Sequence, residues 1–163
     1  MINENSKPVS KSDDAAKDFL RLSLGDDFTR GFDVDSVYCE VQGDKVRWTL
    51  IEFLKCDTVA PEHSHPRRYW NGKTSNSRKF LSLWALCRSL QKDGVDARLL
   101  LVNYRDEKCM VKLMEVVNAT EAAISTSDRV LTFDAWRKWF REFNATKVGA
   151  TWDVLRLMSP PGR

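Results

Sequence analysis

The run Trp48–Leu54 limits the fold of this chain more than any other segment. It is almost continuously apolar and rich in β-branched and aromatic side chains, which is typical of a strand covered on both faces of a sheet. Such a strand needs a layer above it and a layer below it, so the run favours a sheet flanked by helices. Glu52 is its one charged residue, and a buried carboxylate costs free energy unless something offsets its charge.

Regular hydrophobic spacing predicts helices and strands around that run. Residues 34–42 are rich in strand formers and lead through a tight turn at 43–44 into a returning strand over 45–54. Further strands are predicted over 98–104 and 109–117, a weak one over 26–31, and helices over 13–24, 78–92 and 132–144. This order predicts an α/β fold with a mixed central sheet flanked by helices.

Length and composition predict one ordinary domain. The 163 residues, 42% of them hydrophobic, suffice for a single core, and no apolar run reaches the roughly 18 residues of a membrane span. We expect a disordered lead-in over 1–12, the domain over 13–157 and a frayed tail over 158–163. The first residues lack the apolar segment of a secretory signal and the four cysteines form no C-x-x-C pair, so a cytoplasmic protein with free thiols is expected.

Charge is unevenly distributed along the chain. Residues 1–44 hold five Lys or Arg and ten Asp or Glu, so they carry −5 and the remaining residues carry +8. The segment 63–79 has no acid and five basic residues, namely Arg67, Arg68, Lys73, Arg78 and Lys79. A basic loop beside an acidic site suits a phosphate backbone, and the alternative is a solvated surface loop. Tyr69 and Trp70 in this segment would either stack on bases or anchor the loop to the core.

Carboxylates are expected to meet where the two strands of the hairpin lie side by side. Asp33 and Asp35 open the strand that pairs with the run containing Glu52. Two carboxylates about 4 Å apart repel by roughly 4 kcal/mol at an effective dielectric near 20, so a cation, a proton or an arginine must offset them. Mg²⁺ or Mn²⁺ is the expected cation because hard cations prefer carboxylate oxygens. The alternative is an ordinary, partly buried ion pair between Glu52 and a base.

Two other patterns have simpler explanations. Cys56, His63 and His65 could hold zinc, but no regularly spaced fourth ligand follows them. The apolar stripe over 133–143 predicts core packing or a protein interface in preference to a ligand site.

The element order and the carboxylates together resemble the PD-(D/E)XK, or restriction-endonuclease-like, superfamily over residues 13–104. In that family an Asp opens the second strand of a meander and the third strand carries an acid-x-Lys motif. Here Phe32-Asp33-Val34-Asp35 and Ile51-Glu52-Phe53-Leu54-Lys55 stand at those two places.

The resemblance implies a Mg²⁺-dependent nuclease acting on DNA, of the kind used in restriction, repair or defence against mobile elements. It implies Asp35 and Glu52 as metal ligands, with Asp33 in reserve, and Lys55 as the catalytic lysine. The basic residues of the segment 63–79 would hold the phosphate backbone. DNA is then the expected partner, and a homodimer or a larger protein complex is a further expectation.

Lys55 stands one position later than the family's lysine. On a regular strand Glu52 and Leu54 share one face, so Lys55 points to the other. A bulge or a strand end at Leu54 would return Lys55 to the site. Otherwise the site has no catalytic lysine, or Lys79 or Arg78 of the next helix takes that role. The alternative function is therefore a catalytically inactive protein of this fold that binds nucleic acid or a protein partner.

Overall fold

The structure is a computed structural model that describes residues 19, 22–23, 34–42, 45–70, 75–106 and 109–146. The chain divides into two compact units, Met1–Asp33 and Val34–Arg163. The three described residues of the first unit are helical, within the helix expected over 13–24, and Ser23 Oγ donates a hydrogen bond to Phe19 O at 2.8 Å. The strand expected over 26–31, the expected lead-in and tail, Asp33 and Lys73 lie outside the described residues.

The second unit is built on a five-stranded sheet whose spatial order is β1-β2-β3-β4-β5. The strands are β1 (Ser36–Gln42), β2 (Lys45–Lys55), β3 (Asp96–Tyr104), β4 (Val111–Ala119) and β5 (Ile124–Leu131). Strands β2 and β3 are parallel, and the other neighbouring pairs are antiparallel. A parallel pair needs a crossover connection, and helix α2 (Ser75–Lys92) lies within it. The sheet is therefore mixed, as the sequence predicts.

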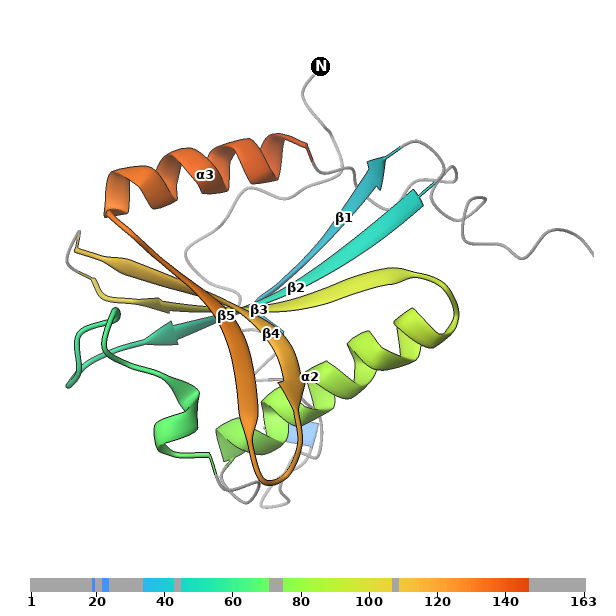
Figure 1. The fold of residues 1–163 in the computed structure, drawn as a ribbon, viewed down its shortest axis with the longest axis horizontal. Helices are drawn as coiled ribbons and strands as arrows, with labels where there is room; N and C mark the ends of the chain where they lie inside the picture. Colours follow the sequence, from blue (N-terminus) through green and yellow to red (C-terminus); the bar gives the residue numbers. More distant parts are fainter. Residues whose placement is uncertain are drawn as a thin grey trace, which may run out of the picture. The chain divides into compact units, whose positions relative to one another are not determined.

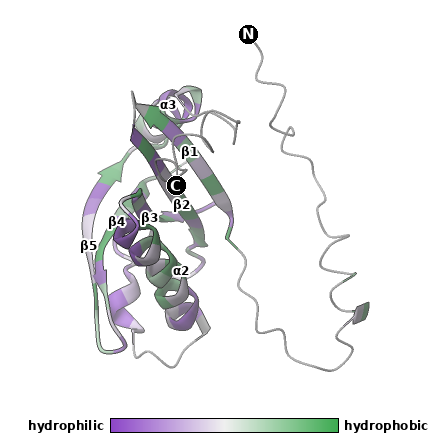
Figure 2. Ribbon diagram, turned by 90° about the vertical axis from the view of Figure 1, so that its right-hand side faces the viewer, coloured by the Kyte–Doolittle hydropathy of each residue, from purple (hydrophilic) through white to green (hydrophobic). Residues whose placement is uncertain are grey.

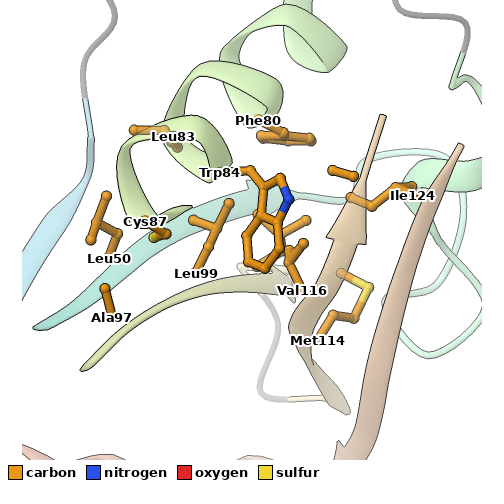
Figure 3. Packing of buried hydrophobic residues seen from close by; sticks show 12 residues of the cluster. Leu50, Phe80, Leu83, Trp84, Cys87, Ala97, Leu99, Met114, Val116 and Ile124 are labelled. Carbon is orange, nitrogen blue, oxygen red and sulfur yellow. The ribbon is translucent and has the colours of Figure 1, made fainter. Parts of the chain in front are cut away.

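Helices cover the two faces of the sheet. Helix α2 lies on one side of it and helix α3 (Phe133–Ala145) on the other (Figure 1). The α2 side of the core is drawn in Figure 3, where side chains from the helix and from the strands interlock. Its buried members include Leu50, Phe80, Leu83, Trp84, Cys87, Leu99, Leu101 and Met114. The predicted α/β class, with a mixed sheet between helices, is confirmed at this level.

The aromatic stripe of α3 forms the core on the opposite side. Trp136 and Phe143 are buried and pack with Ile51, Leu100 and other apolar side chains of the sheet. The ring of Tyr38 on β1 meets that of Phe143 edge-on, at 5.0 Å between centroids. The stripe therefore serves core packing, which is the first of its two predicted roles.

Two elements of the structure have no counterpart in the prediction. One is β5, whose middle is hydrophilic and mostly exposed (Figure 2). The other is a 3₁₀ helix, η1 (Pro66–Arg68), inside the segment expected to be a loop. The two elements are in contact, because His65, which caps η1, lies 2.8 Å from Thr126 of β5.

The four cysteines form no disulfide with one another. Burial raises the pKa of Cys87 to about 11, so its thiol behaves as a small apolar group of the core. Within the described part of the chain, no helix combines the length and the apolar character needed to cross a membrane.

Candidate functional site

The pairing of β1 with β2 sets Asp35 beside Glu52. Ser36 is the partner of Ile51 in the antiparallel register, so the residue that precedes β1 faces the following residue of β2. The amide of Asp35 donates a hydrogen bond to Glu52 Oε1 at 3.2 Å. In return the amide of Phe53 donates to Asp35 Oδ2 at 2.6 Å. These two hydrogen bonds place Asp35 beside Glu52, with each carboxylate bound to a backbone amide.

Lys79 from α2 completes the group. Its Nζ lies 2.6 Å from Glu52 Oε2, and the Glu52 side chain is only 2% exposed, against 20% for Lys79. The next residue, Phe80, is 1% exposed in the core, so the second turn of the helix is fixed over the end of β2. Glu52, Asp35 and Lys79 thus come together from three different segments of the chain.

The electrostatics of Glu52 are those of a carboxylate taken out of water. Burial raises the pKa of Glu52, and the charge of Asp35 raises it further. The ammonium of Lys79 and the Asp35 amide oppose that rise, because both stabilise the ionised form. The net direction is upward, so Glu52 holds a proton more readily than an exposed glutamate does.

Lys55 is not part of this group. Its Nζ lies 2.5 Å from Asp106 Oδ2, and nearly half of its side chain is exposed. Strand β2 stays regular through Lys55, so alternation directs this side chain away from the face that carries Glu52. Arg78, the other candidate on the helix, is exposed next to Lys79.

The basic segment has an exposed part and a part that is packed on the core. Arg67 and Arg68 are exposed on η1, whereas the indole of Trp70 stacks on Phe80 at 6.3 Å and donates from Nε1 to Thr120 O at 2.8 Å. Trp70 therefore anchors the segment to the core, which is one of the two roles considered for it. Tyr69 remains 38% exposed between the arginines and this anchor.

A second polar cluster, which the sequence does not predict, lies around His65. The imidazole accepts a hydrogen bond at Nδ1 from the amide of Arg67 at 3.0 Å, and its Nε2 lies 2.8 Å from Thr126 Oγ1. Asp128 accepts from Thr126 at 2.5 Å and pairs with Lys112 at 3.1 Å. Burial lowers the pKa of His65, and the charge of Arg67 lowers it further. Since Thr126 and Asp128 belong to β5, finding this cluster depends on finding that strand.

The donor chemistry distinguishes between the metals considered. In the ranges that the structure describes, no three His, Cys, Asp or Glu side chains gather closely enough to hold a metal ion, so nothing there supports zinc at Cys56, His63 and His65. Asp35 and Glu52 offer carboxylate oxygens alone. Mg²⁺ keeps several waters and is commonly bound by only one or two carboxylates, so oxygen ligands of this type are those that Mg²⁺ or Mn²⁺ would need.

Comparisons of the chain with protein-family models, with curated proteins and with solved structures gave no match.

Proposed function

We propose that this protein is a nuclease that depends on Mg²⁺ or Mn²⁺, acts on DNA and has a restriction-endonuclease-like core. The observation that carries the proposal is the buried Glu52 carboxylate, held between the Asp35 amide and the Lys79 ammonium at the end of a central strand. Asp35 also places a second acid next to this pair, which a purely structural ion pair does not need. An acidic pair with a lysine is, however, a set of groups suited to metal-assisted phosphodiester hydrolysis.

Each residue has a role that follows from its chemistry. Asp35 and Glu52 would hold the cation. A bound divalent cation would supply positive charge for the attacking and leaving oxygens of the phosphodiester. Lys79 would orient the attacking water and stabilise the charge that develops on the phosphate. Arg67 and Arg68 would contact the DNA backbone, because exposed guanidinium groups pair well with phosphate.

The assignment of the lysine changes from the one that the spacing implied. Lys79 contacts Glu52, and Lys55 contacts Asp106. We therefore give Lys79 the catalytic role that the resemblance gave to Lys55.

One observation favours the second candidate, a catalytically inactive protein that binds nucleic acid. Lys79 already neutralises Glu52, so the pair could be no more than a structural bridge between α2 and β2. Under this alternative Arg67 and Arg68 keep their role and the acids have none.

Cleavage is the property that separates the two candidates. We expect the purified chain to cut at least one substrate among supercoiled plasmid, linear duplex, single-stranded DNA and branched DNA when Mg²⁺ or Mn²⁺ is present, and to be inactive in EDTA. Glu52→Gln should remove the activity while keeping the fold, because the amide can still accept the hydrogen bond from Asp35 at Oε1.

An RNA substrate belongs in the same panel as a control for the substrate class. Cleavage that persists in Glu52→Gln would assign the activity to a contaminant or to another centre. Absence of cleavage on every substrate with either cation would favour the inactive binding protein.

A further inference from the structure

The segment 56–70, which we name the arginine loop, is fixed to the sheet along its length. Asn103, which is 1% exposed, donates from Nδ2 to Ser64 O at 2.9 Å and to Pro61 O at 3.2 Å. At the start of the loop Arg105 donates from Nε to Cys56 O at 2.7 Å. A buried amide that donates to loop carbonyls rigidifies the backbone, because a carbonyl left unsatisfied in the interior is costly.

The second half of the loop is held as firmly. His65 caps η1 with its imidazole and contacts Thr126 of β5, while Trp70 is stacked on Phe80. These contacts lie on both sides of residues 67–69. The three residues between them are therefore presented on a fixed backbone, which lowers the entropy cost of binding a ligand there.

The side chains presented are two arginines and a tyrosine. Among the described residues, neither Arg67 nor Arg68 forms an ion pair with a carboxylate; the Arg67 guanidinium lies against the His65 ring, with Nε 3.3 Å from Nδ1. Tyr69 is 38% exposed, so part of its side chain is open to solvent, and burial of the remainder raises the pKa of its phenol, which keeps the group neutral. Two exposed cations next to a partly exposed ring match a phosphate backbone carrying a base.

We propose that the arginine loop binds a single nucleic-acid strand, with an unpaired base stacked on Tyr69 and the flanking phosphates on Arg67 and Arg68. In a duplex the base faces are already stacked on their neighbours, so a tyrosine ring gains a partner only where the bases are unpaired. The ligand class rests on the proposed function, but binding at the loop requires neither the cation nor cleavage. The favoured substrates are accordingly those with single-stranded portions, such as overhangs, flaps or branches.

The test is fluorescence anisotropy in EDTA, with the full-length Glu52→Gln protein and a labelled oligo-dT. Stacking on an aromatic side chain contributes about 1–3 kcal/mol per base, so Tyr69→Ala should weaken oligo-dT binding roughly 5- to 150-fold. Tyr69→Phe keeps the ring and should keep most of the affinity. An oligomer of the same length made of abasic sites should bind the unmodified loop weakly and be insensitive to Tyr69→Ala.

Two further variants and a duplex define the outcome. Arg67→Ala and Arg68→Ala should each lower the salt dependence of oligo-dT binding, by a slope of about 0.7 for each phosphate that is no longer neutralised. The inference is overturned if the duplex of the same length binds as tightly as oligo-dT, or if folded Tyr69→Ala, verified by its melting temperature, binds oligo-dT like the parent. EDTA and Glu52→Gln remove cleavage from this experiment, so it tests binding alone. If binding depends on Tyr69 but the parent protein cleaves no substrate, the strand-binding role of the arginine loop stands and the proposed nuclease activity fails.

Discussion

Replacing Lys79 by methionine should lower DNA cleavage by about 10²- to 10³-fold, which is the usual cost of removing one group that stabilises charge in the transition state. Methionine keeps most of the length of the side chain and its apolar packing while removing the ammonium. The Lys79 Nζ lies 2.6 Å from Glu52 Oε2, so no other described cation is as close to the proposed centre. Initial rates on the preferred substrate, measured at saturating Mg²⁺, give the comparison.

Lys55→Met is the matched control for that experiment. It removes the same charge from a side chain that pairs with Asp106 and is nearly half exposed, so cleavage should stay close to that of the parent. If Lys55→Met were the inactive variant and Lys79→Met the active one, Lys55 would have to reach Glu52 by a movement of β2, and the assignment made here would fail.

Lys79→Met should also destabilise the fold. Lys79→Met leaves the 2% exposed Glu52 carboxylate without its counter-charge, and breaking a buried pair in this way costs about 3–5 kcal/mol. We expect the lower end, about 3 kcal/mol, because Lys79 is one-fifth exposed and water can reach part of the site. Denaturant unfolding at neutral pH measures the loss.

Two comparisons make that stability prediction specific. Glu52→Gln should cost less than Lys79→Met, because the ammonium that it leaves unpaired is one-fifth exposed. The double variant should recover most of the loss, because no unpaired charge is then buried. The loss should also shrink in acid. Since burial raises the pKa of Glu52 above its unfolded value near 4.5, protonation favours the folded state, and the penalty grows as the pH rises through the folded-state pKa. A deficit that is equal at acidic and neutral pH would contradict a buried carboxylate as its cause.

The strands and helices that carry most apolar surface were predictable from the sequence. The run Trp48–Leu54 forms most of β2, and the helical spacing over 78–92 and 132–144 forms most of α2 and α3. Each of these segments buries one or both of its faces, so the spacing of its apolar residues follows the repeat of the strand or the helix. The position of Asp35 near Glu52 was predictable because the two strands have the sequence of a hairpin, and the observed register, with Ser36 opposite Ile51, agrees with that.

What escaped prediction depends on contacts between distant segments. Strand β5 is mostly polar and buries Ile124 at one end, so its sequence, Ile-Ser-Thr-Ser-Asp-Arg-Val-Leu, carries little apolar alternation. Because β5 was not predicted, the contact of His65 with Thr126 and the attachment of the arginine loop to the sheet could not be predicted either. The choice between Lys55 and Lys79 likewise depends on where α2 crosses the sheet, which is set by the packing of Phe80 and its neighbours and by no local pattern.

Cation binding tests the central claim of a shared Asp35 and Glu52 site most directly, because it needs neither the substrate nor catalysis. Mn²⁺ at about 100 times its dissociation constant should raise the free energy of unfolding by about 2.7 kcal/mol, and Glu52→Gln should abolish that rise. A thermal unfolding series in millimolar Mn²⁺, with Ca²⁺ and EDTA alongside, measures both. A melting temperature that does not respond to Mn²⁺, or that rises equally in Glu52→Gln, would contradict the site.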